Sequence, residues 1–281
     1  MKLIRNPNQI QDLSLKLKSK GKRIGLVPTM GYLHAGHLSL VRRAVKECDV
    51  AVVSIYVNPL QFGPREDFKR YPRNLKQDML LAKTAGADYV FAPGDTDMYR
   101  GEFLTTVGVD KISSILCGTS RPGHFTGVTT VVTKLFNIVL PDISYFGQKD
   151  AQQAVIIKKM VRDLNVPVAI KVLPTVREPD GLAMSSRNAY LNRSQRQDAL
   201  ILYKALGRAR CLIRQGERNP RKIISVIKRL IQRVDSARID YIDIVDAADL
   251  SSKKKITGKV LVVLAVFIGK FRLIDNIALR V

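Results

Sequence analysis

Short runs of apolar, β-branched residues alternate with amphipathic stretches over the first two-thirds of the chain. Five of these runs have the length and composition of buried strands. They span residues 24–28, 50–57, 89–92, 143–146 and 168–173. After the first run, Leu38, Val41, Val45 and Cys48 recur at helical spacing. Strands that alternate with helices predict a parallel sheet with right-handed crossovers.

Three more segments have helical periodicity, over residues 75–82, 128–139 and 151–164. Helices placed between successive strands predict an α/β fold with a Rossmann-like, doubly wound parallel sheet. In such folds ligands bind at the carboxyl ends of the strands. The turns that follow the strands are therefore the places to look for chemistry.

The pattern changes near residue 176. A polar loop is followed by long, basic, amphipathic helices over 195–215 and 220–234, and then by strand-like runs over 241–245, 260–266 and 271–278. This order is typical of a small α+β domain. We predict a Rossmann-like, ligand-binding domain over residues 1–175 and a smaller α+β domain over residues 176–281.

Composition narrows the class of protein. Of the 281 residues, 46% are hydrophobic and 25% are charged, as in folded proteins, and no apolar run approaches the ~20 residues that cross a bilayer. Residues 1–11 lack the apolar segment of a signal peptide, so we expect a cytoplasmic protein without a membrane partner. Three cysteines without a CxxC pair indicate neither a disulfide framework nor a cysteine zinc site.

The formal net charge is +23, which introduces nucleic acid, anionic membranes and polyanionic substrates as partners to consider. The basic residues are spread along the chain, however, and only residues 253–255 form a pure basic run. No basic motif is interleaved with base-stacking aromatics. The distribution favours a solvated basic face over a nucleic-acid partner, and leaves a basic nucleic-acid-binding protein as an alternative.

The strongest local motif is PTMGYLHAGH, residues 28–37, where the first strand passes into the first helix. Gly31 and Gly36 allow the backbone to approach a nucleotide closely, and a helix that begins near His37 offers N–H groups to phosphate. His34 and His37 can donate hydrogen bonds to the same oxygens. Structural histidines and a zinc site are the alternatives, and zinc is disfavoured because only His124 remains as a further histidine ligand.

Other polar groups follow later strands. Lys149 lies in FGQKD after the fourth strand, where it can contact phosphate. The segment AMSSRN, residues 183–188, follows a Pro-Asp-Gly turn and predicts a mobile loop that closes over a triphosphate. Gln61 and Gln153 carry amides suited to hydroxyls and carboxylates, although composition alone favours ordinary turn and helix-surface roles for both residues.

Motifs in combination resemble a known family. The HxGH at His34–His37 is similar to the signature of the nucleotidylyl transferase superfamily. PTMGYLHAGH, SIYVNPLQFGPREDFKRYPR, RPGHFTGVTTVV, YFGQKDAQQ and PTVREPDGLAMSSRNAYL, in that order, resemble the pantothenate synthetase (pantoate–β-alanine ligase) family. The resemblance implies the HUP/nucleotidylyl transferase type of Rossmann-like fold.

The resemblance also implies an activity. It is the ATP-dependent ligation of pantoate and β-alanine through a pantoyl-adenylate, with release of AMP and pyrophosphate, in pantothenate and coenzyme A biosynthesis. It implies a homodimer and Mg²⁺ carried mainly by ATP, with no assigned protein ligands. Another HxGH nucleotidylyltransferase, acting on a phosphorylated acceptor, is the alternative enzyme.

By resemblance, site residues fall into three groups. The expected catalytic residues are His37 as proton donor, His34, Lys149 and Arg187. The expected ATP contacts are Met30, Gly31, Tyr32, Leu33, His34, Ala35, Gly36, His37, Gly147, Gln148, Lys149, Asp150, Val176, Met184, Ser185, Ser186 and Arg187. The expected pantoate and β-alanine contacts are Gln61, Gln153 and Asn58.

Overall fold

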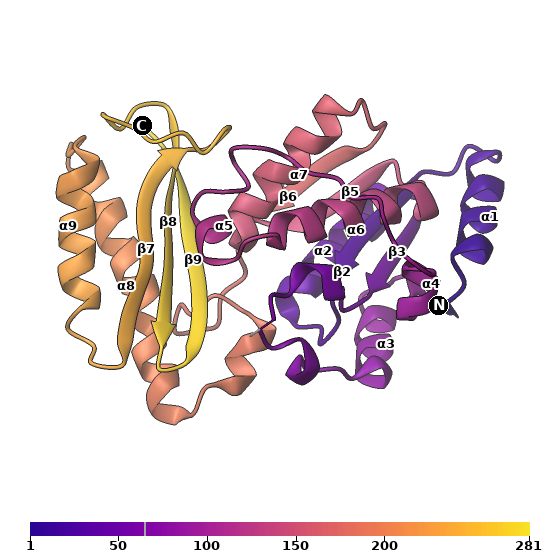
Figure 1. Ribbon diagram of the computed structural model, residues 1–281, viewed down its shortest axis with the longest axis horizontal. Helices are drawn as coiled ribbons and strands as arrows, with labels where there is room; N and C mark the ends of the chain where they lie inside the picture. The colour runs from indigo at the N-terminus through magenta and orange to yellow at the C-terminus, as the bar shows by residue number, and fades with distance from the viewer. Residues whose placement is uncertain (65) are drawn as a thin grey trace. The chain divides into compact units, whose positions relative to one another are not determined.

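The chain divides into two compact units in the computed structural model, which describes residues 1–64 and 66–281 (Figure 1). The first unit comprises Met1–Gly147 and Ile156–Pro174, and the second comprises Gln148–Val155 and Thr175–Val281. The predicted first domain, residues 1–175, included Gln148–Val155, which the contacts group with the second unit.

Six parallel strands form the sheet of the first unit, in the order β1-β4-β3-β2-β5-β6. They are β1 (Lys2–Ile4), β2 (Ile24–Thr29), β3 (Val50–Ile55), β4 (Tyr89–Phe91), β5 (Ile143–Gly147) and β6 (Ala169–Leu173). The chain builds outward from β2 on one side and then returns to place β5 on the other, so the strand order reverses between β2 and β5. The predicted doubly wound sheet is confirmed, with β1 as an additional strand too short to show a periodicity.

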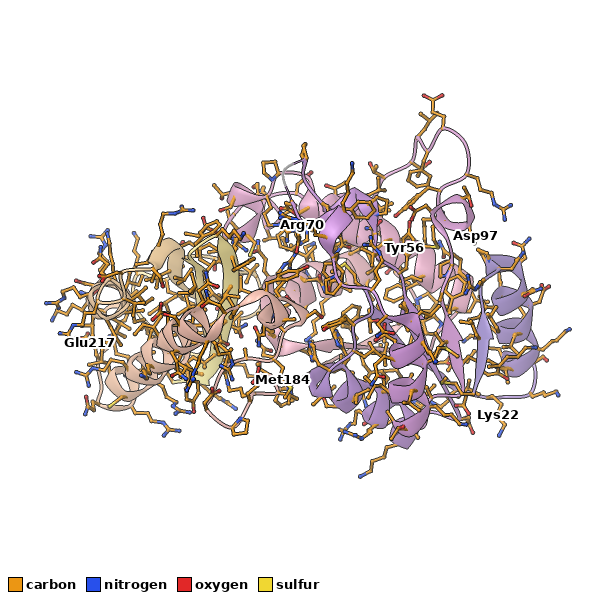
Figure 2. The ribbon with its side chains drawn as sticks, turned by 90° about the horizontal axis from the view of Figure 1, so that it is seen from below. Lys22, Tyr56, Arg70, Asp97, Met184 and Glu217 are labelled. Atoms are coloured by element: carbon orange, nitrogen blue, oxygen red, sulfur yellow. The ribbon has the colours of Figure 1, made fainter. Side chains whose placement is uncertain are left out.

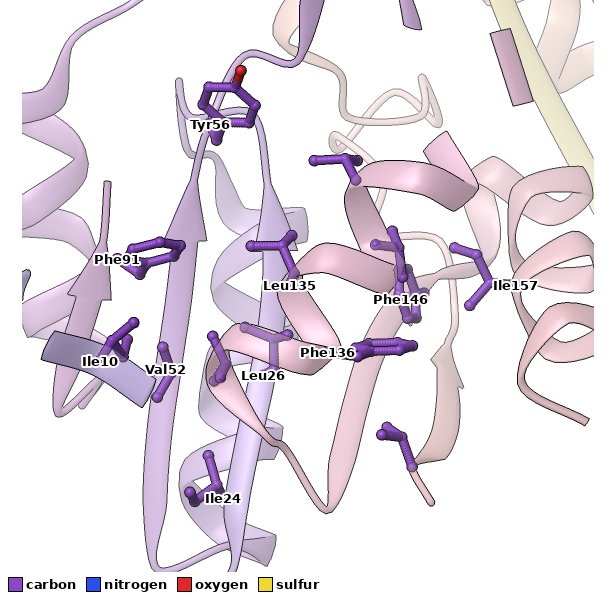
Figure 3. Packing of buried hydrophobic residues seen from close by; sticks show 14 of the residues in the cluster. Ile10, Ile24, Leu26, Val52, Tyr56, Phe91, Leu135, Phe136, Phe146 and Ile157 are labelled. Carbon is purple, nitrogen blue, oxygen red and sulfur yellow. The ribbon is translucent and has the colours of Figure 1, made fainter. Parts of the chain in front are cut away.

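Helices cover both faces of this sheet. They are α1 (Pro7–Lys18), α2 (Ala35–Glu47), α3 (Leu75–Thr84), α4 (Asp95–Met98), α6 (His124–Val139) and α7 (Ala151–Asp163), and the short α5 (Cys117–Ser120) precedes α6 along the chain. On one face, Leu135 and Phe136 of α6 pack with Leu26 of β2 and Val52 of β3 (Figure 3). The opposite face is covered by α2 and α3.

Carboxylates fix the amino ends of the strands. Asp49 accepts from the backbone N–H of Arg23 at 2.8 Å, and Asp142 accepts from that of Ile24 at 2.7 Å. Asp88 accepts from the N–H of Ala51 at 2.8 Å. These acidic side chains serve the fold, and the carboxyl ends of the strands remain as the edge where ligands bind in doubly wound sheets.

The second unit contains an antiparallel sheet in the order β7-β8-β9, with two long helices packed on it. The elements are α8 (Arg193–Arg214), α9 (Pro220–Ile231), β7 (Ala237–Asp246), β8 (Lys259–Ile268) and β9 (Phe271–Arg280). Asn192 and Asn219 start the two helices by accepting backbone N–H groups with their side chains. The predicted α+β arrangement is confirmed, and none of the described helices has the length and hydropathy that a membrane span requires.

Candidate active site

The loop Met30–His34 follows β2 and lies at the carboxyl end of the strand where the order of the sheet reverses. Two consecutive residues turn the chain with positive φ, Gly31 at 81° and Tyr32 at 50°. A Cβ at Gly31 would lie 2.9 Å from both the Asp78 carboxylate and the Ile55 side chain. The motif glycine is therefore required both by its backbone conformation and by its close packing.

A buried carboxylate holds this loop from behind. Asp78 of α3 accepts the Tyr32 N–H at 2.9 Å and the Leu33 N–H at 2.7 Å, and it is 2% exposed. Burial raises the pKa of Asp78, while the two backbone hydrogen bonds act in the opposite direction. Asp78 was not predicted from the sequence; an acidic residue inside a helix that otherwise packs apolar side chains was the available signal.

The two histidines of the motif are coupled to the start of α2. The helix begins at Ala35, not near His37 as predicted, and His34 is its N-cap. The His34 Nδ1 atom accepts the Gly36 N–H at 3.2 Å, and the His37 Nδ1 atom accepts the His34 N–H at 3.3 Å. The two ring centroids lie 4.1 Å apart.

These hydrogen bonds select a tautomer. A nitrogen that accepts a hydrogen bond carries no proton, so in each neutral ring the proton resides on Nε2. His34 and His37 thus present two Nε2–H groups beside a helix N-terminus, whose dipole favours negative charge. This arrangement suits the oxygens of a phosphate that accumulates charge.

Gln61 lies against the same loop, in the short 3₁₀ helix η1 (Pro59–Gln61) after β3. Its Nε2 atom lies 2.9 Å from the Met30 sulfur, and its Oε1 accepts from Asn58 Nδ2 at 3.2 Å. Asn58 also donates to the Gly127 carbonyl at 3.0 Å and accepts from the Tyr99 hydroxyl at 2.7 Å. Asn58 is thus a buried support that orients Gln61 toward Met30.

A second set of side chains, which we call the Gln61 clamp (Glu66, Arg121 and His124), holds the Gln61 backbone. The Gln61 carbonyl accepts from Arg121 Nη2 at 3.2 Å and from His124 Nδ1 at 2.8 Å. Because a carbonyl only accepts, His124 is protonated at Nδ1, and its Nε2 accepts from Arg121 Nη1 at 2.9 Å. His124 therefore links the Gln61 carbonyl to Arg121.

Glu66 completes the clamp by receiving Arg121 in a bidentate pair, at 2.6 and 2.5 Å. Burial is the largest single influence and opposes ionisation of Glu66, but the hydrogen bonds and positive charge of Arg121, with smaller contributions from His124 and the Gly63 backbone, together lower the pKa of the carboxyl. The RPGHF motif contains both Arg121 and His124, but neither residue was predicted to have this role. Over residues 1–64 and 66–281, no three His, Cys, Asp or Glu side chains are grouped as metal ligands.

A cavity of about 270 Å³ opens beside the loop, at the carboxyl ends of β3 and β4. Met30, Tyr56, Arg73, Asp78 and Asp95 are among the residues that line it. Tyr56, labelled in Figure 2, follows β3, and burial raises the pKa of its hydroxyl. The motif loop therefore has both a fixed backbone and an adjacent hollow.

In the second unit, a buried amide fixes the FGQKD turn. Asn276 of β9 donates to the carbonyl oxygens of Gln148 and Lys149, both at 2.9 Å, and accepts from Gln148 Nε2 at 3.1 Å. Lys149 Nζ lies 3.9 Å from Asp150, a long ion pair. Gln153 lies half-buried near the start of α7. The turn thus holds the Lys149 backbone, while within the described part of the chain its ammonium makes one weak ion pair.

Arg177 anchors the MSSR loop, which comprises Met184–Arg187. This side chain pairs with Asp275 of β9 at 2.6 and 2.9 Å and donates to the Gly181 carbonyl at 3.0 Å. The predicted Pro-Asp-Gly turn is present, with Gly181 at φ 98°. Across the turn, the Met184 N–H donates to the Val176 carbonyl at 3.0 Å. The backbone therefore pairs two of the residues expected to contact the nucleotide.

The serines of that loop shape its last turn. Ser185 caps the 3₁₀ helix η4 (Ser186–Tyr190) by accepting the Arg187 N–H at 3.3 Å, and Ser186 is buried. The expected site residues thus form one group within each unit. The first unit holds Met30–His37, Asn58, Gln61 and Gly147, and the second holds Gln148–Asp150, Gln153, Val176 and Met184–Arg187.

Comparisons with known proteins give a consistent result. The model of the family described as pantoate-beta-alanine ligase matches residues 2–278. A pantothenate synthetase of Carboxydothermus hydrogenoformans is 57% identical over 94% of both chains, and one of Caldicellulosiruptor saccharolyticus is 54% identical over 98% of both.

Solved structures agree with this result. A pantothenate synthetase from Thermus thermophilus has a TM-score of 0.94 and 41% identity, covering 99% of each chain. The pantoate-beta-alanine ligase from Francisella tularensis, solved with beta-gamma ATP and beta-alanine, has a TM-score of 0.80 and 37% identity, covering 99% of this chain and 97% of its own.

Proposed function

The chain belongs to the pantoate-beta-alanine ligase family, and on this premise we propose that it joins pantoate to β-alanine at the expense of ATP. The observation that carries the proposal is the paired Nε2–H groups of His34 and His37, held at the start of α2 beside Gln61 and Met30. This set combines donors for phosphate with an amide for a hydroxy acid.

The reaction has two steps. The pantoate carboxylate attacks the α-phosphorus of ATP and pyrophosphate leaves, which gives a pantoyl-adenylate. The β-alanine amine then attacks the acyl carbon, AMP leaves with the electron pair of the acyl C–O bond, and the amine loses a proton. No covalent bond to the protein is needed, so catalysis rests on positioning and on stabilising phosphate charge.

We assign the stabilisation of phosphate charge to four side chains. His37, the proton donor, and His34 donate from Nε2, while Lys149 and Arg187 supply positive charge. The backbone around Met30–Gly36 accommodates the nucleotide, together with Gly147, Gln148, Asp150, Val176, Met184, Ser185 and Ser186. Fixed donors that meet charge only as it develops are worth more than donors that must reorganise during the reaction.

Pantoate and β-alanine are assigned to the amides. Gln61 is oriented by Asn58 on one side and by the Gln61 clamp on the other, so its Nε2–H₂ donors have a defined direction. Gln153 would supply the second amide. Mg²⁺ would be carried by the ATP phosphates, with no assigned protein ligand, and would neutralise charge on the leaving pyrophosphate. A homodimer and a cytoplasmic location remain predictions from the sequence.

Pyrophosphate exchange into ATP tests the proposal. Exchange in the presence of magnesium should require pantoate and should be absent with other small carboxylates. In His37→Ala the exchange rate should fall by roughly 100-fold, the typical effect of losing one donor to developing charge. Thermal unfolding of the variant checks that the fold survives. Exchange supported only by a phosphorylated acceptor would instead indicate the alternative nucleotidylyl transfer, and full exchange in a folded His37→Ala protein would refute the assigned role.

A further inference from the structure

One segment concentrates the positive charge of the chain. Residues 204–233 contain ten lysines and arginines and a single acidic residue, Glu217. They comprise the second half of α8, the connection that follows it, and α9. The proposed ligase activity uses none of these side chains, so their charge needs a separate explanation.

The fold turns the basic side of α9 outward. Ile223, Ile227 and Ile231, at successive helical turns, are fully buried in the core of the second unit. The opposite side of the helix is therefore exposed. Figure 2 shows nitrogen-tipped side chains gathered around the labelled Glu217, in this part of the second unit.

Two hollows meet on this surface. One, of about 260 Å³, is lined by Arg208, Val226, Arg229, Leu230 and Arg233. The other, of about 450 Å³, is lined by Leu212, Glu217, Arg221, Lys222, Ser225, Val226 and Arg229. Because they share Val226 and Arg229, the hollows lie next to each other, and we call the two together the α8–α9 groove.

The arginines of the groove lack internal counter-charges. Among described residues, no carboxylate lies within 4 Å of the guanidinium groups of Arg208, Arg221, Arg229 or Arg233, and the groove contains one ion pair, Lys222 with Glu217 at 3.8 Å. The Lys222 side chain in that pair is 71% exposed, so the pair neutralises little of the local field. Four guanidinium groups are thus available to an external anion.

Three of these arginines follow one another along α9 and its C-terminal end. With a rise of about 1.5 Å per helical residue, Arg221 and Arg229 lie roughly 12 Å apart along α9. Arg233 extends the series beyond the helix, and Arg208 faces it from α8. Such an array suits a chain of repeated anions better than a single compact anion.

The groove walls indicate how such a chain would be recognised. Its described lining residues include aliphatic and small side chains and no aromatic ring on which a base could stack. Guanidinium groups bind phosphate oxygens well, and contacts to phosphate carry no sequence information. Insertion into a membrane is disfavoured because the apolar side of α9 is already buried in the core.

We propose that the α8–α9 groove binds the phosphodiester backbone of single-stranded nucleic acid without reading its bases. Hollows of about 260 and 450 Å³ are far smaller than the body of a duplex, which could lay only one of its backbones against the groove. The field of a chain with a net charge of +23 would assist association at low ionic strength. The sequence distribution favoured a solvated basic face; the structure instead places part of that charge around the α8–α9 groove.

Fluorescence anisotropy with a labelled single-stranded RNA of random sequence tests the proposal. With four phosphate contacts, log K should fall with log salt at a slope of about −3 between 50 and 200 mM. The double variant Arg229→Ala/Arg233→Ala should reduce the magnitude of that slope by about 1.4 and weaken binding roughly tenfold. The matched control is Lys16→Ala/Lys20→Ala, which removes two exposed charges from the first unit.

Binding by the control should equal that of the unchanged protein, and pantothenate formation should be the same in all three proteins. Absence of binding at 50 mM salt would overturn the proposal. So would equal weakening in both double variants, which would assign binding to net charge alone. Tighter binding of a duplex, of inorganic polyphosphate or of anionic vesicles than of the single strand would also overturn it.

Discussion

The loops that carry the proposed catalytic side chains are fixed differently in the two units. In the first unit, the buried carboxylate of Asp78 receives two backbone N–H groups of the histidine loop. In the second unit, the equally buried carboxylate of Asp275 receives the guanidinium of Arg177, which holds the MSSR loop. The first anchor is a pair of hydrogen bonds from backbone N–H groups of the loop, and the second is an ion pair between two side chains.

This difference has physical consequences. Backbone N–H groups hold the chain whatever side chains the loop carries, so the histidine loop keeps Tyr32 and Leu33 in place while its side chains meet a ligand. The loop contributes a single side chain, Arg177, to the ion pair. Without Arg177, the buried Asp275 carboxylate would carry a large desolvation penalty. The second anchor should therefore be the more sensitive to a single substitution.

The largest expected effect is at Arg177. Arg177→Ala should lower the free energy of unfolding by about 3–5 kcal/mol, because Asp275 would remain buried without a cation. Arg162→Ala, at a side chain that is 75% exposed, should change it by less than about 0.5 kcal/mol. Urea denaturation measures both.

A second substitution separates the pair from its surroundings. Removing both charges in Arg177→Ala/Asp275→Ala should recover much of the loss, since no unpaired charge remains buried. A double variant whose loss equals the sum of the two single losses would contradict the ion-pair anchor.

The next effect is at Asp78. Asp78→Ala should cost roughly 3 kcal/mol, since it removes the acceptor of the buried Leu33 N–H and of the part-buried Tyr32 N–H, and it should slow pyrophosphate exchange by releasing the histidine loop. Asp88→Ala is the matched control, because Asp88 accepts one N–H at the amino end of the sheet. It should cost about 1 kcal/mol and leave exchange unchanged. Similar exchange rates in both variants would show that Asp78 does not position the loop.

The sequence predicted what local patterns encode. Residues 28–37 contain the glycines and histidines of the first loop, and the apolar runs marked the central strands of the parallel sheet. The role of Asp78 was not predicted because this residue lies 45 and 46 residues from the N–H groups it accepts. It also lies inside a segment whose pattern was that of an ordinary helix. A side chain that bonds to a distant backbone produces no periodicity.

The same limit applies to the second unit and to the Gln61 clamp. Gln148–Val155 groups with the second unit, where Asn276, 128 residues from Gln148, bonds to its carbonyl. Arg121 and His124 reach Gln61 from 60 and 63 residues away. Short motifs indicated which segments matter, while the partners that hold those segments became visible only in three dimensions.

Gly31 provides a further test of how the Met30–His34 loop is held. Gly31→Ala should cost about 2 kcal/mol, because φ is 81° and the new Cβ would lie 2.9 Å from Asp78 and Ile55. Gly21→Ala has a similar φ of 70° but meets no atom within 4 Å, so it measures the backbone penalty alone, about 1 kcal/mol. Only Gly31→Ala should also slow exchange. Equal effects of the two substitutions would mean that close packing against Asp78 is unimportant.

The smallest expected effect lies in the Gln61 clamp, which combines an ion pair with contacts to backbone. Glu66→Gln keeps the shape of the side chain but removes the charge that holds Arg121. If Gln61 binds pantoate, KM for pantoate should rise roughly three- to fivefold with kcat nearly unchanged, since only substrate positioning is affected. Stability at pH 7 should fall by about 1 kcal/mol. Glu102→Gln, at an exposed residue of the first unit, is the control and should alter neither quantity.

Acid titration tests whether the negative charge of Glu66 stabilises the protein. Because Arg121 lowers the pKa of Glu66 below its ordinary value of 4.5 in the folded protein, the carboxylate contributes stability above that pH. This contribution is lost as the pH falls through the lowered pKa. The stability difference between the unchanged protein and Glu66→Gln should therefore be constant near neutrality and shrink below about pH 4.5. A difference that persists undiminished to pH 3, or a change in kcat in place of KM, would show that the clamp does not act through the Glu66 charge.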